Sequence, residues 1–324
     1  MQKIHDSISN LQLGEATSFE GLTVFPLFCE SSREKDYLTL DEALEKGQAR
    51  VTEVSESGAV PTLRFENPGD QRVLLVDGDE LTGAKQNRII NLTIMVPAQT
   101  GIDIPVSCVE AGRWSHNSRE FASPKRAMMA RARASKSASV SASMKAAESR
   151  RSDQGEVWQE VGVYQQALEV KSPTDSMSDI YDSYEVPLEN YRKAFSAGQN
   201  QVGALFAVNG RIQGLEVFDC SETFANYLER LVSSYAITRL AERGELEFTA
   251  TPDTEKFLGR VSQAEAERFD ALGEGDDLRL SGKDLAGGAL SAGDRIVHLV
   301  AFDLQNPASR SGHRAESYRR RSTH

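Results

Sequence analysis

The sequence predicts an α+β protein, because strand-like and helix-like segments are grouped along the chain instead of alternating one by one. Short segments rich in β-branched residues, separated by turn residues, fill residues 49–110. Helical periodicity appears in residues 156–197, and a hairpin pattern and a long amphipathic pattern follow it. We therefore expect an N-terminal antiparallel β-rich unit, then helices, a β-hairpin and a long amphipathic helix.

The first elements are one strand and one short helix. Residues 22–28 (LTVFPLF) form a short apolar run that predicts a buried strand, in which Pro26 favours an edge position or a bulge. Residues 38–47 (LTLDEALEKG) predict a helix, with Asp41 as its N-cap and Gly47 as its C-terminal stop.

Five strands are expected in residues 49–110, in the segments ARVTEV, TLRFEN, RVLLVD, IINLTIMVPA and IDIPVSCVE. The connection inside residues 74–94 (LLVDGDELTGAKQNRIINLTI) is much longer than a tight hairpin needs. We expect it to be a polar loop between two strands.

Helices are expected in two later segments. Residues 156–170 carry apolar side chains at helical spacing, and Ser152 and Asp153 precede them as candidate caps. Residues 178–197 continue the pattern, disturbed at Pro187.

The clearest local signal is the hairpin at residues 202–219. Asn209 and Gly210 join two apolar runs there, and Asn-Gly tolerates the positive φ angles of a type I′ turn. A long amphipathic helix over residues 221–244 follows directly and ends at Gly244.

The C-terminal third is expected to contain an acidic, irregular region at residues 245–285 and a buried strand at residues 295–303. We expect a single composite domain with a sub-boundary near residue 150. The expected parts are an N-terminal arm (1–20), the domain (21–305) and a basic, flexible tail (306–324).

The overall composition excludes several classes of protein. The net charge of −11 argues against a general nucleic-acid coat. The three cysteines, Cys29, Cys108 and Cys220, are odd in number and widely spaced, which favours a reducing cytoplasm over a disulfide framework. The chain has neither a secretory signal at its start nor an apolar run of about 18 residues, so we expect no membrane span.

The segment 111–151 departs from this acidic average, with ten Lys/Arg and two Asp/Glu. Its Ala- and Ser-rich middle predicts a mobile or ligand-ordered segment. Three partners suit its charge: a nucleic acid, the acidic residues 264–277 of the same chain, or a phosphate-rich ligand. The near contacts of such a ligand would be Arg113, Arg119, Lys125 and Arg126.

The first candidate site lies in the polar connection of residues 77–91. Asp77, Asp79 and Glu80 are gathered carboxylates of the kind that hold Mg²⁺ or serve as acid and base. The basic and amide side chains that follow suit phosphate binding; they are Lys85, Gln86, Asn87, Arg88 and Asn91. The alternative is an ordinary turn followed by a solvated strand end.

The second candidate site lies in residues 106–116 (VSCVEAGRWSH). Strand alternation places Cys108 and Glu110 on one face, just before Arg113 and Trp114. Trp114 suits stacking on a base. The alternative is a buried, inert cysteine beside a surface ion pair and a packed tryptophan. The common nucleotide-binding fingerprints GxGxxG and GxxxxGK[ST] are absent.

Six motifs of the chain carry a family resemblance. They are DGDELTGAKQNRIIN (77–91), IPVSCVEAGRWSH (104–116), SREF (118–121), RSDQGEVWQEV (151–161), QVGALFAVNGRIQGLEVFD (201–219) and SYAITRLA (234–241). In this order they resemble the ARPP family, the ARG and rhodanese-phosphatase-superfamily-associated proteins, where ARG denotes ADP-ribosylglycohydrolase. The resemblance covers roughly residues 20–305. The chain departs from the family pattern at Asp79, commonly Glu, and at Ala111, commonly a larger polar residue.

The resemblance implies a place in NAD or ADP-ribose metabolism and leaves the reaction open. We expect a nucleotide-handling protein, either a hydrolase acting on ADP-ribose or a related phosphorylated nucleotide, or a non-catalytic binding module for such a ligand. The expected catalytic residues are Glu80, Glu110 and Cys108. The expected ligand contacts are Lys85, Gln86, Asn87, Arg88, Asn91, Arg113 and Trp114, with Mg²⁺ at Asp77 and Asp79 as an option.

Overall fold

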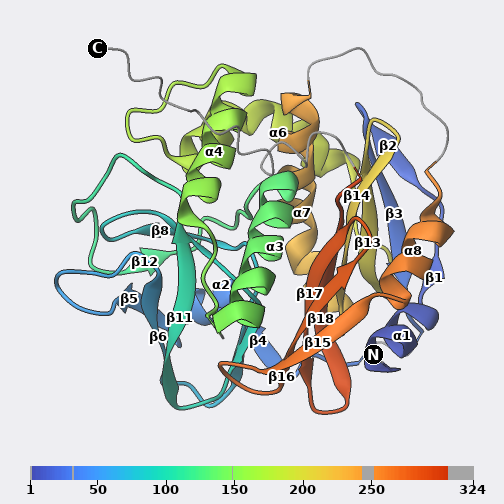
Figure 1. Ribbon diagram of the computed structural model, residues 1–324, viewed down its shortest axis with the longest axis horizontal. Helices are drawn as coiled ribbons and strands as arrows, with labels where there is room; N and C mark the ends of the chain where they lie inside the picture. Colours follow the sequence, from blue (N-terminus) through green and yellow to red (C-terminus); the bar gives the residue numbers. More distant parts are fainter. Residues whose placement is uncertain (1, 31–32, 148, 243–251, 306–324) are drawn as a thin grey trace, which may run out of the picture.

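The computed structural model describes residues 2–30, 33–147, 149–242 and 252–305. It confirms the α+β class, with three sheets and several helices packed on them (Figure 1). None of the helices in these ranges is long and apolar enough to cross a membrane.

The largest sheet has nine antiparallel strands in the order β1-β3-β13-β14-β18-β17-β16-β15, with β2 also paired to β3. It joins the N-terminal strands to the C-terminal half of the chain (Figure 1). The strands are β1 (Gln12–Leu13), β2 (Thr17–Phe19), β3 (Leu22–Phe28), β13 (Gln201–Val208), β14 (Arg211–Phe218), β15 (Glu265–Asp270), β16 (Asp276–Gly282), β17 (Leu285–Ala292) and β18 (Arg295–Asp303).

Strand alternation gives this sheet two apolar faces. Phe206 packs into the core beneath α7 (Ser221–Ala241), with its ring stacked on Tyr235, whereas the adjacent Leu205 faces the other core. That second face is covered by α1 (Gln2–Ser9) and α8 (Thr254–Ser262). The central strands of the sheet are therefore buried on both sides, whereas the outer strands β1, β2 and β15 are more exposed.

Two smaller sheets are built from the first half of the chain. A six-stranded sheet has the order β12-β8-β9-β11-β6-β5, and its edge strands β12 and β5 contact each other, so the sheet curls like a barrel. A three-stranded sheet has the order β10-β7-β4. The strands are β4 (Tyr37–Thr39), β5 (Arg50–Glu53), β6 (Thr62–Asn67), β7 (Arg72–Leu75), β8 (Glu80–Gly83), β9 (Arg88–Ile90), β10 (Ile94–Val96), β11 (Thr100–Cys108) and β12 (Phe121–Ala122).

The remaining helices connect the small sheets to the large one. They are α2 (Leu40–Glu45), α3 (Ala130–Ala147), α4 (Gln154–Leu168), α5 (Met177–Ser183) and α6 (Glu185–Ala194). Helix α3 contacts both α4 and β17, and α4 contacts β11 and α7. The curled sheet and the large sheet are therefore joined through a shared helical layer.

The hairpin prediction is confirmed, with Asn209 at φ 48° and Gly210 at φ 72° between β13 and β14. The last strand, the helix at α4 and the long helix α7 are also confirmed, although Gly244 lies outside the described residues. The helical pattern disturbed at Pro187 divides into α5 and α6 at Tyr184, which leaves Pro187 in the first turn of α6.

Several predicted elements are wrong. The connection inside residues 74–94 contains strand β8, and the segment IINLTIMVPA supplies β9 and β10 to different sheets. Helix α2 is capped by Thr39 in a capping box with Glu42, so Asp41 lies inside the helix. The strand errors arise because pairing with remote strands, which local patterns do not report, decides where β8, β9 and β10 lie. The start of α2 is instead set by a local competitor for the cap, since Thr39 and Glu42 form the capping box.

The two segments of unusual composition are ordered where the structure describes them. Residues 130–147 form the buried helix α3, contrary to the mobile segment expected there. Residues 254–282 form α8, β15 and β16, contrary to the irregular region expected there, and residues 245–251 lie outside the described residues, as does the tail 306–324. The expected arm 1–20 contains α1, β1 and β2, which pack on the large sheet.

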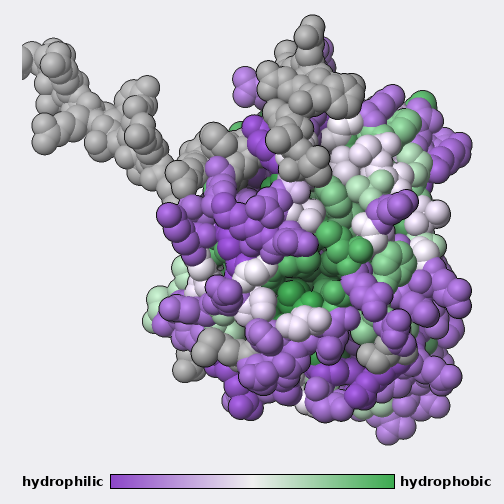
Figure 2. All heavy atoms as spheres, turned by 90° about the vertical axis from the view of Figure 1, so that its right-hand side faces the viewer, coloured by the Kyte–Doolittle hydropathy of each residue, from purple (hydrophilic) through white to green (hydrophobic). Residues whose placement is uncertain are grey.

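One side of the molecule carries an apolar patch at its surface. The side that carries β1, β2, β3 and α8 shows a hydrophobic patch bordered by hydrophilic residues (Figure 2). The strands β8 and β12 lie at the opposite side in Figure 1. The polar residues predicted to form a site therefore do not belong to this apolar surface.

Candidate functional site

The polar connection of residues 77–91 divides its side chains between the two faces of the curled sheet. Glu80 pairs with Ile89, and Leu81 pairs with Arg88, across strands β8 and β9. Side chains of directly paired residues point to the same face, and neighbours along a strand point to opposite faces. Glu80 and Arg88 consequently lie on opposite faces.

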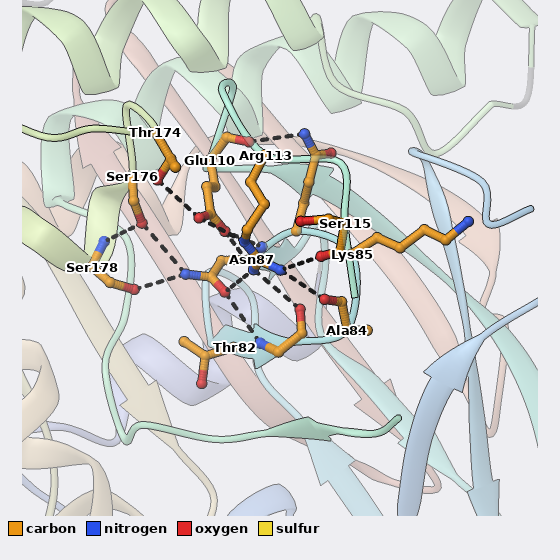
Figure 3. Close-up of polar contacts among 12 residues, drawn as sticks. Thr82, Ala84, Lys85, Asn87, Glu110, Arg113, Ser115, Thr174, Ser176 and Ser178 are labelled. Atoms are coloured by element: carbon orange, nitrogen blue, oxygen red, sulfur yellow. Dashed lines mark hydrogen bonds and ion pairs between the residues drawn. The ribbon is translucent and has the colours of Figure 1, made fainter. Parts of the chain in front are cut away.

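Glu110 and Arg113 form a buried ion pair, the Glu110–Arg113 pair, at the end of β11 (Figure 3). Arg113 donates from Nε to Glu110 Oε1 at 2.8 Å and from Nη2 to Oε2 at 2.6 Å. Its Nη1 donates to the carbonyls of Ala84 and Ser115. The guanidinium is thus occupied by contacts within the chain.

Both carboxylate oxygens of Glu110 are also fully bonded. Oε2 accepts from the backbone N–H of Asn87 at 3.0 Å, and Oε1 accepts from the Thr174 hydroxyl at 2.9 Å. Burial pushes the pKa of Glu110 upward, but the bonds from Arg113, Asn87 and Thr174 outweigh it and hold the pKa below its ordinary value. Glu110 therefore stays ionised and holds three segments together.

Asn87 stands at the centre of the cluster (Figure 3). Its amide donates to Ser176 Oγ at 3.4 Å and to Ser178 Oγ at 3.1 Å. Its carbonyl oxygen accepts from Arg113 Nη2 and from the backbone N–H of Gly83. Asn87 thereby links the Glu110–Arg113 pair to the serines at the start of α5.

A cleft of about 390 Å³, hereafter the polar cleft, opens beside these residues. Its hydroxyl and amide groups come from Thr82, Asn87, Asn117, Thr174, Ser176 and Ser178. Its charged groups come from Glu110, Arg113, Arg126, Asp179 and Asp182.

Glu80 lies behind Ser178 and is completely buried. Ser178 Oγ donates to Glu80 Oε1 at 2.7 Å, and Oε2 has no hydrogen-bond partner within the described part of the chain. Burial raises the pKa of Glu80 to about 7, although Ser178 and Arg126 partly counteract it.

The other face of the sheet holds Arg88 and Cys108, which are paired across β9 and β11. The Cys108 thiol donates to Gln86 Oε1 at 3.1 Å, and burial raises its pKa. A buried thiol with a raised pKa is a poor nucleophile, which disfavours the catalytic role expected for Cys108. It also contacts the backbone of Glu110, whose carboxylate turns instead to Arg113.

Arg88 is completely buried without an ion pair among the described residues, and its Nε and Nη2 have no hydrogen-bond partner there. The exposed Trp114 ring covers it, with the Arg88 guanidinium 5.8 Å and Lys85 Nζ 5.4 Å from the ring centre. Lys85 extends away from the Asn87 cluster and donates to the Glu56 carbonyl (Figure 3). These three residues therefore do not face the polar cleft.

The carboxylates proposed for Mg²⁺ lie in two separate buried clusters. Asp77 Oδ1 is 2.9 Å from Lys136 Nζ, and Asp79 Oδ1 is 2.8 Å from Arg230 Nη1. Gly78 between them has φ 86°, and a Cβ there would lie 2.5 Å from Arg133 Nε. Cations of α3 and α7 thus already compensate both charges, and this arrangement does not fit a metal pair.

No group of three or more potential ligands suited to a metal ion occurs within the described residues. Asn91 likewise makes structural contacts, accepting from Ser107 and donating to the carbonyl of Arg150.

The basic segment 111–151 is compensated largely by carboxylates of the same chain. Lys145 pairs with Glu267, which lies in the acidic stretch predicted as a partner. Other pairs are Arg131 with Glu160, Arg133 with Glu216, Lys125 with Glu45 and Arg126 with Asp182. Intramolecular pairing therefore accounts for much of this positive charge.

The segment 172–182, which supplies a wall of the polar cleft, has no sequence motif that marks it as part of a site. Ser178 and Asn87 are 91 residues apart in the chain, so no local pattern connects them. The only available signal was the density of Ser, Thr and Asp in KSPTDSMSD (171–179), which indicates a turn and a helix cap.

A comparison with protein families gives a match over nearly the whole length of the chain. A family model described as the ARG and Rhodanese-Phosphatase-superfamily-associated Protein domain (ARPP-1) matches residues 10–302. No curated protein and no solved structure matches the chain. The chain belongs to the ARPP family.

Proposed function

We propose that this protein is a hydrolase of a small nucleotide of the ADP-ribose type, bound in the polar cleft. The observation that carries the proposal is Glu80, a buried carboxyl with one oxygen bonded to a cleft-lining serine and a pKa raised to about 7. A group with a pKa near neutrality is suited to accept and return a proton during hydrolysis.

The two glutamates of the site are suited to different tasks. Glu110 remains charged because Arg113, Asn87 and Thr174 bond to it, so its role is to hold the walls of the cleft in place. Glu80 exchanges its proton near pH 7. Environments that separate the pKa values of neighbouring carboxyls are a common feature of acid–base sites.

The lining of the polar cleft supports a ligand rich in hydroxyl groups. Ribose hydroxyls both donate and accept, and Thr82, Asn87 and Asp182 supply matching groups. Arg126, which donates to Asp182 at 2.5 Å at the cleft, is the cation that would contact a phosphate. Membership of the ARPP family supports the ADP-ribose type of nucleotide through the ADP-ribosylglycohydrolases in the family's name.

A binding module without turnover is the second candidate. The specific observation that favours it is the complete bonding of Glu110 and Arg113 within the chain, which leaves neither group free to take part in a reaction. In that case the ligand would bind tightly and remain intact.

The test measures turnover of ADP-ribose, its phosphorylated derivatives and ADP-ribosylated protein, with and without Mg²⁺. We expect Glu80→Gln to lower the rate by about 100-fold or more, because the amide cannot exchange a proton. The matched control is Glu160→Gln, a buried glutamate with a raised pKa that pairs with Arg131 outside the cleft, and we expect it to keep the wild-type rate.

Calorimetry with the same ligands separates the two candidates. Tight binding of an intact ligand, lost in Arg126→Ala, would replace the hydrolase with the binding module. Neither binding nor turnover of any of these ligands would refute both.

A further inference from the structure

Ser178 is the hydroxyl through which Glu80 reaches the polar cleft. We infer that Ser178 is a catalytic nucleophile, with Glu80 as its general base, and that it acts on a neutral carboxylic ester carried by a hydroxylated ligand. The inference rests on the proposed function only for the class of ligand.

The geometry fits a nucleophile that is held ready by its neighbours. Ser178 Oγ donates to Glu80 Oε1 at 2.7 Å and accepts from the Asn87 amide at 3.1 Å. Its backbone N–H donates to Ser176 Oγ, which fixes the start of α5. A serine hydroxyl bonded to a base and oriented by a third group is the arrangement that activates oxygen nucleophiles.

Glu80 is placed to act as a base on this hydroxyl alone. Strand β8 and the backbone bond from Glu80 N–H to the Arg126 carbonyl hold it in position. Its side chain is completely buried, while Ser178 lines the cleft. A ligand in the cleft would therefore meet Ser178 first, and the proton of Ser178 would pass to Glu80.

The charge of the cleft favours an ester over a phosphoryl group as the electrophile. Glu110, Asp179 and Asp182 line it, against the two guanidinium groups of Arg113 and Arg126. Glu110 and Arg113 neutralise each other as an ion pair, which leaves Asp179 and Asp182 against Arg126. Attack on a phosphoryl dianion would add negative charge to a lining that already has an excess of carboxylates, whereas an ester carbonyl is neutral.

The groups needed to stabilise the reaction are N–H donors next to Ser178. The Asn87 amide lies 3.1 Å from its Oγ, and Arg126 Nη1 lies 3.5 Å from its carbonyl oxygen. Both side chains line the polar cleft. Such donors can bond the oxyanion that forms when the carbonyl carbon becomes tetrahedral.

The reaction balances with water as the only co-reactant. Ser178 Oγ attacks the carbonyl carbon, and its proton passes to Glu80. The C–O bond of the ester breaks, and Glu80 returns the proton to the departing alkoxide, leaving an acyl-serine. Water then attacks the acyl carbon and gives a proton to Glu80; the carboxylic acid leaves, and Ser178 regains its proton.

The test uses p-nitrophenyl acetate as an ester probe and p-nitrophenyl phosphate as its phosphoryl counterpart. We expect the wild-type protein to release a burst of about one equivalent of p-nitrophenolate from the acetate and none from the phosphate. Mass spectrometry of the digested protein should locate an acetyl group on Ser178. This measurement needs no variant, so it does not depend on how a variant folds.

Variants then assign the roles. We expect Ser178→Ala to abolish the burst, and Glu80→Gln to slow it by about 100-fold and to remove its rise with pH near 7. The matched control is Ser57→Ala, an exposed serine outside the cleft, which should keep the burst. Urea midpoints would verify that each variant is folded.

The Ser178 nucleophile and the proposed nucleotide hydrolase can fail independently of each other. An acetyl group on another residue, no burst, or a full burst in Ser178→Ala would overturn the nucleophile, whether or not nucleotides are hydrolysed. A burst on Ser178 without turnover or binding of any ADP-ribose-type ligand would overturn the proposed function and leave Ser178 as the nucleophile of an esterase.

Discussion

Glu80 and Glu110 are two buried carboxyls beside one cleft, and they differ in how completely their oxygens are bonded. Glu110 receives bonds on both oxygens, two of them from Arg113. Glu80 receives one from Ser178. The comparison shows that burial alone does not decide the protonation of a carboxyl: burial raises the pKa of Glu80, whereas at the less deeply buried Glu110 the bonds from Arg113, Asn87 and Thr174 outweigh it.

The largest expected effect on the free energy of unfolding comes from removing the cation of the Glu110–Arg113 pair. Arg113→Met should lower the free energy of unfolding by about 3–5 kcal/mol, because it leaves Glu110 buried and charged without its partner. Urea denaturation at pH 7 measures this. As a control, Arg126→Met should cost less than about 1 kcal/mol, since its partner Asp182 is 61% exposed. Equal losses would show that burial of the pair does not matter.

The pH dependence of stability tests Glu80. Its pKa is raised from 4.5 to about 7 in the folded protein, so between these values the folded state holds a proton that the unfolded state has lost. Stability should therefore fall as pH rises through this window, by roughly 3 kcal/mol.

Glu80→Gln should lack this loss and be more stable than the wild type at pH 8, as measured by urea unfolding at several pH values. The same slope in both proteins would assign the pH dependence to other groups.

The contribution of Glu110 to the pH dependence of stability is expected to have the opposite sign. Its pKa is lowered on folding, so its contribution is present above its ordinary pKa and is lost as pH falls through the folded value. Glu110→Gln should cost roughly 1.5–3 kcal/mol at pH 7, the range for hydrogen bonds to charged groups. The difference from wild type should shrink in acid, and a difference that is constant with pH would contradict the ionised state of Glu110.

The smallest expected effect is on the bond from Thr174 to Glu110. Thr174→Val should cost about 1 kcal/mol in the free energy of unfolding, because it removes a single hydroxyl donor. Thr174→Ser keeps the hydroxyl and should remain close to wild type. If the two variants are equally destabilised, the loss comes from packing and not from the hydrogen bond.

The sequence identified part of the candidate site. It selected Glu80, Asn87, Glu110 and Arg113, which the structure brings to one cluster, from two polar stretches next to strands. It could not find Ser178, because a serine near a helix start is usually read as a cap. It also assigned Arg88 and Lys85 to the same wall, since the strand β8 that separates the faces was not expected.

The features that depend on neighbouring residues can be predicted without the fold. Asn209 and Gly210 adopt the turn that their backbone freedom favours, and the amphipathic pattern of α7 supplies a buried face. The motif match over residues 10–302 also follows from sequence alone.

Which charges are compensated depends on contacts that form only when the chain folds. Asp77 and Asp79 look like metal ligands until Lys136 of α3 and Arg230 of α7 are seen beside them. Glu80 looks like an ordinary turn carboxylate until β8 buries it behind Ser178. The physical reason is that a carboxyl's pKa and bonding depend on groups brought close by folding, which are remote in the chain.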